Sequence, residues 1–445
     1  MMTTTRTKPR PAPAERAAPP LWETEAFVLR GEDRGGLTVA ARALDAYLEA
    51  HPATDLADLA FTLNRDVAPG GSRLGVVAKS VAELRSRLAR AVEKLADPAC
   101  EQVRDTSGIY WFARPLAEEG HVAFLFPGEG AQYPGMLRDV VAAFPEASAF
   151  LAEADAALAG VRQGEPPISQ VFANGDTSVS LDRLDNAMLS VLIADGVLHR
   201  VLSRLGVEPA FAAGHSMGEM AALSAAGATS MDAGFLDRFG VTMKTLQRQE
   251  ADADDDCVLL AVGAGRDALA GLLTDEPVYL AMDNCPRQTV LIGLSDVMAR
   301  VESRLKERGL ICERLSFRRP YHTPLFEPQL GPLRSCSPRR RSAGRALPGV
   351  LLHHGGAVPD DAGLMRDLAV RHWAAPSAVH RHGASDARRW RPDLRRGRAA
   401  RQPLGVRRGH PARPGNSRRC RPTRRRPGLT QAQPPARPVG RATCR

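Results

Sequence analysis

The stretch PAFAAGHSMGEMAALSAA at residues 209–226 decides the fold of this chain. Its first five residues predict a short buried strand, and its second half has the apolar spacing of a helix. Between them, GHSMG at 214–218 fits a nucleophile elbow, a sharp strand-to-helix turn that exposes a serine hydroxyl at the top of a sheet. The stretch therefore predicts an α/β fold with Ser216 as candidate nucleophile.

The same turn supplies a second chemical group. It places the backbone N–H of Met217 at a helix N-terminus, where it can donate to the oxyanion of a tetrahedral intermediate. Five-residue patterns of this form also arise by chance, so the motif alone fits an ordinary strand–helix turn equally well. The predicted strand and helix on either side favour the catalytic interpretation.

A serine nucleophile needs a general base, and His322 is the candidate. It lies in YHTPLF at residues 321–326. A histidine taken alone is more often structural, so this assignment depends on its pairing with Ser216. His215 adjoins the nucleophile, but a neighbouring residue on an elbow points the wrong way, so we interpret it as a packed support.

A separate subdomain is predicted between the nucleophile and the base, at about residues 255–317. Its elements follow the order β-α-β-β-α-β, which is the ferredoxin-like arrangement. They are the strand Val258–Val262, the helix Arg266–Leu273, the strands Val278–Met282 and Thr289–Gly293, the helix Asp296–Arg308 and the strand Ile311–Phe317. Their position along the chain indicates an insertion into the fold that carries Ser216.

The upstream half divides into three parts. Residues 1–20 are polar and rich in Pro, Thr and Arg, and we expect a disordered arm. Residues 21–118 predict a small α/β unit without a catalytic constellation. Its elements are the helices Leu37–Ala50 and Val81–Leu95, the buried strand Leu74–Val77, and Leu59–Leu63, which fits either a helix or a strand. In the third part, the strand Val122–Phe126 runs into the glycine turn PGEGAQ, and the helix Ala187–Leu205 ends at Gly206.

Charge is distributed unevenly along the 445 residues, which are enough for two or three domains. The net charge is +10, yet residues 331–445 alone carry +22, from 27 arginines, no lysine and five acidic residues, all aspartate. Residues 1–330 therefore carry −12. We accordingly expect neither a nucleic acid nor a membrane as partner of the body.

Cysteine usage and hydropathy indicate the compartment. The seven cysteines form no CxxC pair, so neither a zinc site nor a disulfide framework is indicated. No signal-peptide core and no apolar run of membrane-spanning length is present in the sequence. We expect a soluble cytoplasmic protein without a bound metal.

Four motifs in fixed order resemble the signatures of one enzyme family. They are FPGEGAQ at 126–132, GHSMGE at 214–219, NCP at 284–286 and YHTP at 321–324. Over about residues 120–330 the chain resembles the malonyl-CoA:acyl carrier protein transacylases and the acyltransferase domains of type I polyketide synthases. DLADLAFTL at 55–63 resembles the linker between ketosynthase and acyltransferase in modular synthases.

The resemblance implies an α/β-hydrolase-like large subdomain with a parallel sheet and the inserted ferredoxin-like small subdomain. It implies that Ser216, activated by His322, takes an acyl group from acyl-CoA and passes it to an acyl carrier protein, in polyketide or fatty-acid biosynthesis. A ketosynthase or larger synthase is a further implied partner, and no bound cofactor is expected. The implied site comprises the oxyanion amides of Glu129 and Met217, a backbone carbonyl that orients the base, and the substrate-binding residues Gln132, His215, Asn284 and Arg238.

The sequence departs from the family pattern at three positions. Glu129 and Asn186 each stand where Gln is usual. In members that use malonyl groups an arginine four residues before a Met holds the substrate carboxylate, but counting back from Met243 gives Phe239, with Arg238 one position away. One step along a helix turns a side chain by about 100°. Either Arg238 reaches the carboxylate by a local shift, or the acyl group carries no carboxylate, or Arg238 is an ordinary surface residue.

Residues 331–445 predict an irregular, disordered Arg/Pro-rich tail. A nucleic-acid-binding arm is one interpretation, but natural arms mix Lys with Arg, whereas Arg, Pro, Ala, Gly and His result from GC-rich codons in the wrong frame. A one-base shift at residues 391–413 permits RTFVEVGPRGNLSAFVEDILR, which resembles the family's closing strand and helix. We hypothesise that the frame is lost after Leu330, regained near Pro359 and lost after Pro376. The chain would then lack the closing strands of the large subdomain and the carbonyl that orients His322.

Two rival functions share some of these features. A serine esterase or thioesterase also uses the elbow, but it needs an acid between Ser and His and has no ferredoxin-like insert. An inactive, truncated fragment of a synthase module is the other.

Overall fold

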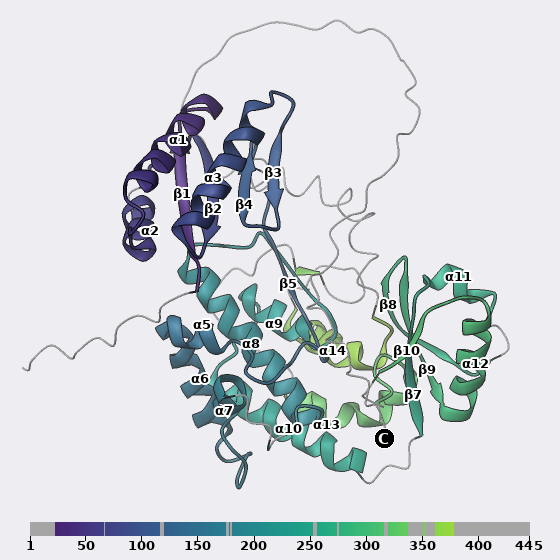
Figure 1. The fold of residues 1–445 in the computed structure, drawn as a ribbon. Coiled ribbons are helices and arrows are strands. Elements are labelled where there is room, and N and C mark those ends of the chain that lie inside the picture. Colours follow the sequence, from purple (N-terminus) through teal and green to yellow (C-terminus); the bar gives the residue numbers. More distant parts are fainter. Residues whose placement is uncertain are drawn as a thin grey trace, which may run out of the picture. The chain divides into compact units, whose positions relative to one another are not determined.

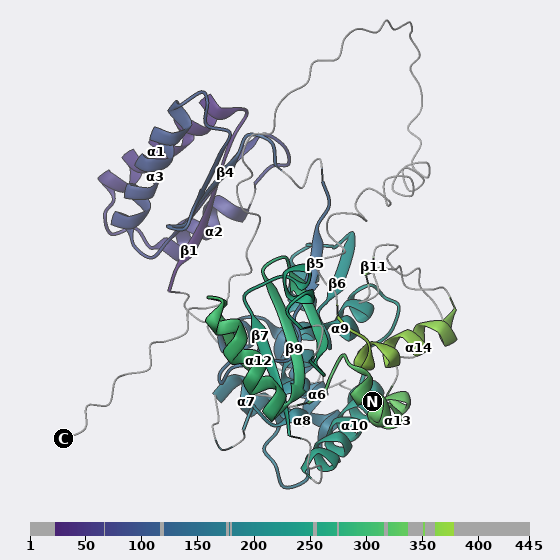
Figure 2. The ribbon, with the colours of Figure 1, turned by 90° about the vertical axis from the view of Figure 1, so that its right-hand side faces the viewer.

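The computed structural model describes residues 23–65, 67–115, 120–174, 178, 180–251, 256–273, 276–315, 319–336, 350–351 and 361–377. All of them belong to the first of two structural units, Met1–Trp390. Three sheets organise the described residues (Figures 1 and 2). The predictions for residues 1–20 and for the chain beyond residue 377 lie outside them.

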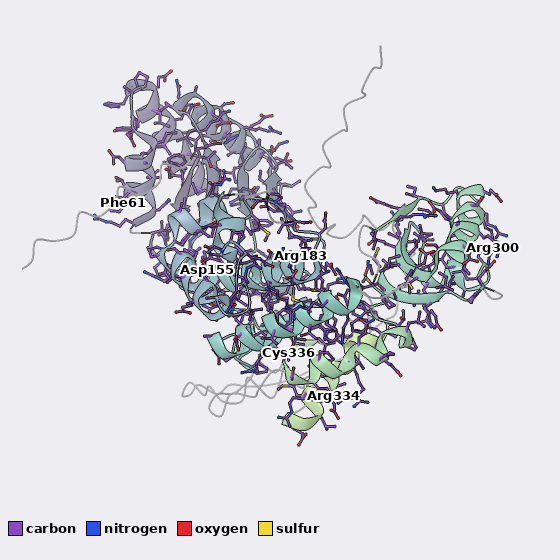
Figure 3. The ribbon with its side chains drawn as sticks, turned by 90° about the horizontal axis from the view of Figure 1, so that it is seen from below. Phe61, Asp155, Arg183, Arg300, Arg334 and Cys336 are labelled. Atoms are coloured by element: carbon purple, nitrogen blue, oxygen red, sulfur yellow. The ribbon has the colours of Figure 1, made fainter. Side chains whose placement is uncertain are left out.

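The N-terminal part is an antiparallel sheet with order β1-β2-β4-β3. Its strands are β1 (Glu25–Gly31), β2 (Ser72–Ala78), β3 (Gln102–Asp105) and β4 (Ile109–Phe112), and its helices α1 (Arg34–Ala50), α2 (Leu56–Arg65) and α3 (Val81–Ala96). Asp33 and Ser80 cap α1 and α3 through their side chains. These two helices line one face of the sheet (Figure 2) and bury their leucines against it. The segment that fits either a helix or a strand lies in α2, from which Phe61 projects, 64% exposed (Figure 3).

The part that carries Ser216 has a parallel sheet with order β11-β6-β5. Its strands are β5 (Ala123–Phe126), β6 (Phe211–Gly214) and β11 (Val350–Leu351). The helices before and around it are α5 (Arg138–Ala143), α6 (Pro145–Leu158), α7 (Ile168–Asn174), α8 (Leu184–Arg204), α9 (Gly218–Ala225) and α10 (Ala233–Ala251). Phe124 and Phe126 of β5 join the core around α8, whereas Leu125 on the other face is 71% exposed. One face of this sheet is therefore packed and the other is open at Leu125.

The segment between nucleophile and base forms an antiparallel sheet with order β10-β7-β9-β8. Its elements are β7 (Cys257–Val262), α11 (Arg266–Ala270), β8 (Tyr279–Cys285), β9 (Gln288–Leu294), α12 (Ser295–Glu307) and β10 (Cys312–Arg314). The buried side of α12 packs through Met298, Val301 and Leu305 into the core of this sheet. Arg300 lies on the opposite, solvent side of α12 (Figure 3), where it pairs with Asp296.

The chain after this sheet forms η1 (Pro324–Gln329), α13 (Leu330–Ser335), α14 (Ala362–Arg371) and η2 (His372–Ala374). The prediction of an irregular tail from residue 331 is wrong for α13, whereas α14 and η2 lie within Pro359–Pro376, where the reading frame is expected to be regained. Asp361 caps α14 by accepting from Leu364 N, and Trp373 is fully buried in the core with Tyr321 and Phe326. Such long-range packing leaves no periodic signal in so short a segment. Within the described part of the chain, none of the helices has the length and apolarity needed to cross a membrane.

Candidate active site

Ser216 and His322 lie in hydrogen-bonding contact. The Ser216 Oγ is 2.8 Å from His322 Nε2, and the two residues are 6% and 0% exposed. On the other side of the ring, Nδ1 is 2.9 Å from the carbonyl oxygen of His372 and 3.2 Å from that of Ala375. Carbonyl oxygens only accept, so Nδ1 carries the hydrogen and Nε2 is left to accept from the serine hydroxyl. This tautomer is the one a general base requires.

The elbow at Ser216 is held by close backbone packing. Ser216 has φ of 54°, a left-handed conformation that non-glycine residues rarely adopt. A Cβ added to Gly214 would lie 2.1 Å from Glu219 N, and one added to Gly218 would lie 2.3 Å from Phe126 O. Only glycine therefore fits at either position, which is the physical reason for the sequence pattern.

The candidate base itself has a left-handed backbone conformation. His322 has φ of 62°, and its N–H donates to Trp373 O at 2.7 Å. The Trp373 ring lies 5.6 Å from that of Tyr321, centre to centre. The expectation that the carbonyl that orients His322 is missing is therefore wrong. Residues 372–375 supply it, because η2 runs past the imidazole and is anchored by the buried tryptophan.

The loop after β5 lies against the elbow. A Cβ added to Gly128 would approach His215 O to 2.6 Å and Ser216 Cβ to 3.3 Å. Met217 is the N-cap of α9, and the first amides of this helix are bonded in the turn: Gly218 N donates to His215 O and Glu219 N to Ser216 O, each at 3.0 Å. The Glu129 carboxylate turns to Arg319, with Oε1 at 2.9 Å from Nη1, and both side chains are buried.

The remaining predicted polar residues contact each other or the backbone. His215 Nε2 lies 2.9 Å from Asn284 Oδ1, and Asn284 Nδ2 donates to Gln288 Oε1 at 3.2 Å. Burial lowers the pKa of His215, so this ring is neutral near pH 7. Gln132 Oε1 accepts from Gly130 N at 2.8 Å, which braces the turn. The His215–Asn284 contact joins the elbow to β8.

Arg238 lies on α10, within the stretch Ala233–Ala251. Its Nη1 is 3.3 Å from the position of a Cβ on Gly234, one helical turn back, and its buried Nε has no hydrogen-bond partner. Among the described residues no hydrogen bond or ion pair joins it to Ser216 or His322. Phe239, at the position counted back from Met243, is fully buried and stacks on Phe235 at 5.7 Å.

Three groups at the site were not named from the sequence: the carbonyls of His372 and Ala375, and the Arg319 side chain. The available signal for the first two was the hypothesis that the reading frame is regained between Pro359 and Pro376, the stretch that contains both residues. A backbone acceptor leaves no residue preference, so no motif could identify it. Arg319 stands three residues before His322. A charged side chain so close to a buried base is expected to have a partner of opposite charge.

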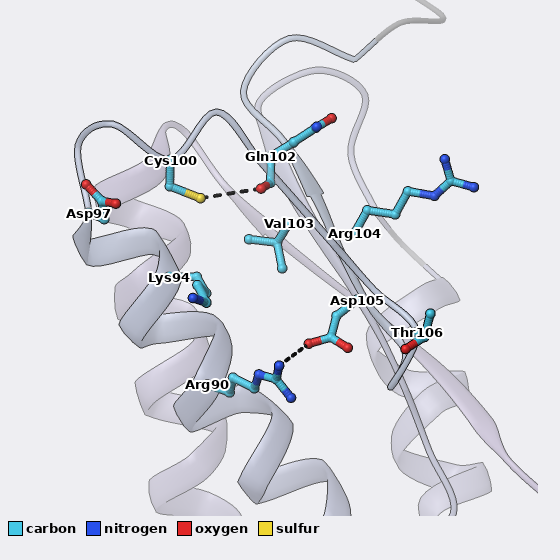
Figure 4. Close-up of a pocket in the computed structure, with 9 residues that line it drawn as sticks. All are labelled: Arg90, Lys94, Asp97, Cys100, Gln102, Val103, Arg104, Asp105 and Thr106. Carbon is cyan, nitrogen blue, oxygen red and sulfur yellow. Dashed lines mark hydrogen bonds and ion pairs between the residues drawn. The ribbon is translucent and has the colours of Figure 1, made fainter. Parts of the chain in front are cut away.

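In the described part of the chain, neither a metal-binding cluster nor the pocket of the N-terminal sheet unit adds a second reactive site. Among the described residues, no group of three or more His, Cys, Asp or Glu side chains is placed to hold a metal ion. An open pocket of about 490 Å³ lies in the N-terminal sheet unit between α3 and β3 (Figure 4). Its charged residues include Arg90, which pairs with Asp105 at 2.7 Å. The pocket contains none of the residues described above and no nucleophile–base pair.

Comparisons with known proteins point to the same family as the four sequence motifs. Residues 123–335 match the family described as the acyl transferase domain, and residues 28–88 match the one described as CurL-like, PKS C-terminal. The non-reducing polyketide synthase of Arthroderma gypseum is 28% identical over 323 residues, which are 70% of this chain and 17% of that protein. The phenolphthiocerol synthesis polyketide synthase type I of Mycobacterium marinum is 29% identical over 331 residues, 72% of this chain and 14% of that protein. The chain thus spans about a sixth of these relatives.

Solved structures share the fold. The acyltransferase domain from module 8 of the salinomycin polyketide synthase is 22% identical, with a TM-score of 0.63, and the match covers 80% of each chain. The acyltransferase domain of SpnD, in complex with 2-(pent-4-yn-1-yl)malonyl, is 25% identical with a TM-score of 0.62, over 83% of each chain. These likenesses confirm the predicted α/β class with a parallel sheet. Residues 123–335 of this chain are thus similar to the acyl transferase domain, and the chain shares the fold of the acyltransferase domains of polyketide synthases.

Proposed function

We propose that this chain transfers an acyl group of the malonyl type from coenzyme A to the phosphopantetheine thiol of an acyl carrier protein, through an ester on Ser216. One observation carries the proposal. His322 Nε2 lies 2.8 Å from Ser216 Oγ while Nδ1 faces two backbone carbonyls. A serine paired with a correctly protonated imidazole is the arrangement that activates a hydroxyl for acyl transfer.

The reaction has two balanced halves. His322 Nε2 takes the proton of Ser216 as Oγ bonds to the thioester carbon, and the C–S bond breaks with transfer of that proton to the coenzyme A sulfur. The carrier-protein thiol then gives its proton to Nε2 and attacks the ester, and Ser216 leaves with the proton. The carbonyls of His372 and Ala375 favour the imidazolium that forms between these steps.

The oxyanion is assigned to backbone amides. Met217 N–H at the start of α9 and Glu129 N–H in the loop against the elbow donate to it, and the dipole of α9 adds to the effect. His215 and Asn284 line the acyl side, with Gln132 bracing the turn. Among the described residues no hydrogen bond or ion pair joins Arg238 to Ser216 or His322, so we assign it no role in the proton-transfer steps.

The finer architecture follows the family. We assign residues 119–330 to the acyltransferase, with an α/β-hydrolase-like large subdomain and a ferredoxin-like insert at 255–317, and residues 21–118 to a ketosynthase-to-acyltransferase linker. The partners are acyl-CoA, an acyl carrier protein and a larger synthase, in polyketide or fatty-acid biosynthesis in the cytoplasm. The two-residue β11 and the exposed Leu125 of β5 support the hypothesis that frame shifts have removed closing elements of the large subdomain. Resequencing the coding DNA tests it, and an unshifted frame would refute it.

Radiolabelled malonyl-CoA, incubated with the chain and a carrier protein, tests the activity. We expect label on Ser216 and then on the carrier protein. Release of free acid without labelled carrier protein would mean a hydrolase. That outcome is not the expected one, because His322 Nδ1 faces carbonyls where an esterase places a carboxylate. The Ser216→Ala variant is the control, and label that persists in it would remove Ser216 from the mechanism.

A further inference from the structure

A buried ion pair links the loop after β5 to the segment that carries His322. Glu129 Oε1 and Arg319 Nη1 are 2.9 Å apart, although the residues are 190 positions apart in the chain. The two side chains are 7% and 8% exposed. In no other ion pair between described residues are both side chains below 10% exposed, so this pair is set apart from the surface pairs of the molecule.

Burial makes this pair sensitive to the loss of one member. Removing one partner leaves an uncompensated charge away from water, whereas replacing both by neutral groups is far less disruptive. The pair also demands one geometry, because a guanidinium and a carboxylate bond well only over a narrow range of distance and angle. It therefore fixes the spacing of the two backbone segments that carry it.

Each end of the pair is stiffly connected to the reactive centre. Glu129 follows Gly128, which packs directly on the backbone of the elbow. At the other end, residues 319–323 are all buried, and the Thr323 hydroxyl donates to Pro320 O at 2.7 Å. A shift of Arg319 is therefore passed on to His322 because no exposed or loosely packed residue lies between them.

We propose that Glu129 and Arg319 are a positioning pair, which sets the distance between the Glu129 backbone amide and the His322 imidazole on the two sides of Ser216. The inference rests on the proposed function, in which that amide binds the oxyanion and that imidazole moves the proton. In this proposal neither side chain contacts the acyl group. Loss of the pair thus affects the transition state more than substrate binding, and kcat more than KM.

The experiment uses the full chain and two readouts: malonyl transfer to carrier protein, and labelling of the activated serine by a fluorophosphonate. We expect Glu129→Gln, which keeps the backbone amide, and Arg319→Met each to lower kcat and the labelling rate at least about 10-fold, with KM within about threefold. The double variant buries no unpaired charge, so its loss should be smaller than the product of the two single losses. Arg319→Lys keeps the charge and should lose less than Arg319→Met.

The matched control is Glu276→Gln in the ferredoxin-like insert. It removes a carboxylate that is 11% exposed and 2.7 Å from Arg304, and kcat should stay within about twofold. The proposal is overturned if Glu129→Gln keeps kcat within about twofold, if Glu276→Gln loses as much, or if the single losses simply multiply in the double variant. Labelling of Ser216→Ala at the original rate would instead overturn the proposed function. If Ser216 is labelled and the Glu129→Gln variant reacts at an unchanged rate, the positioning pair is refuted while the proposed function stands.

Discussion

Ser216 and His322 both adopt a left-handed backbone conformation, but the two are held in different ways. The elbow is held locally, by glycines that let residues 214–219 pack on the end of β5. The base is held from a distance, by residues 372–375, whose backbone accepts from both its N–H and its ring. The position of Ser216 is thus determined by a short local motif, whereas the position of His322 depends on a segment 50 residues later in the chain.

The largest effect is expected from Gly218→Ala, which disrupts the elbow that holds Ser216. The added methyl group would meet Phe126 O at 2.3 Å, so the elbow must distort, and fluorophosphonate labelling of Ser216 should fall about 1,000-fold or more. Gly271→Ala is the control, since a Cβ there meets nothing within 4 Å and the labelling rate should not change. Normal labelling of Gly218→Ala would show that the elbow does not need its glycine.

A smaller effect is expected from Trp373→Ala, which loosens the segment at residues 372–375 that supports His322. Removing a fully buried tryptophan should lower the free energy of unfolding by about 3–5 kcal/mol and, in the folded protein, the labelling rate about 10-fold to 100-fold. Chemical denaturation and labelling on the same sample measure both.

Trp111→Ala is the matched control, because Trp111 is buried to a similar degree in the N-terminal sheet unit. It should destabilise that unit without slowing the labelling. Equal slowing in the two variants would show that the labelling rate reports only general instability.

The free energy of unfolding is expected to depend on pH through α8, which packs against α9, the helix that follows the elbow. Burial raises the pKa of Asp195 from 3.8 to about 8. Between those values the folded state holds a proton that the unfolded state has released. The free energy of unfolding should therefore fall from pH 4 to pH 8 and level off above it, by about 2–5 kcal/mol in total.

Asp195→Asn removes this titration and should be the more stable protein at pH 9, with the difference vanishing below about pH 4 in urea denaturation. Asp296→Asn is the control, because its pairing with Arg300 lowers the pKa of Asp296 and leaves no titration in this range. A constant difference between Asp195→Asn and the unmodified chain at all pH values would contradict the assignment.

The smallest effect is expected from Arg238→Ala. Since no hydrogen bond or ion pair between described residues joins this side chain to Ser216 or His322, transfer from malonyl-CoA and from acetyl-CoA should change by less than about threefold each. A loss of 10-fold or more with malonyl-CoA alone would show that Arg238 is the carboxylate clamp after all.

The same contrast explains what the sequence could predict. Local patterns placed the helix at 187–205 and the strand at 258–262 within three residues of α8 and β7, and the α/β class with a parallel sheet is confirmed. The roles assigned to the site residues stay predictions, although the structure brings Ser216 and His322 together. The strand expected at 311–317 is described only over Cys312–Arg314. The support of His322 and the Glu129–Arg319 pair could not be found, because both depend on contacts between distant segments and neither has a spacing rule.

The acceptors behind His322 have a consequence for genetics. Both are backbone oxygens, so every amino acid at positions 372 and 375 retains them, including proline. A screen that replaces side chains would pass over the groups that fix the tautomer of the base, and natural sequences are free to drift at those positions as long as the chain path is kept. Only a change in the backbone itself, such as an ester in place of the peptide bond after His372, weakens the acceptor and exposes what it does.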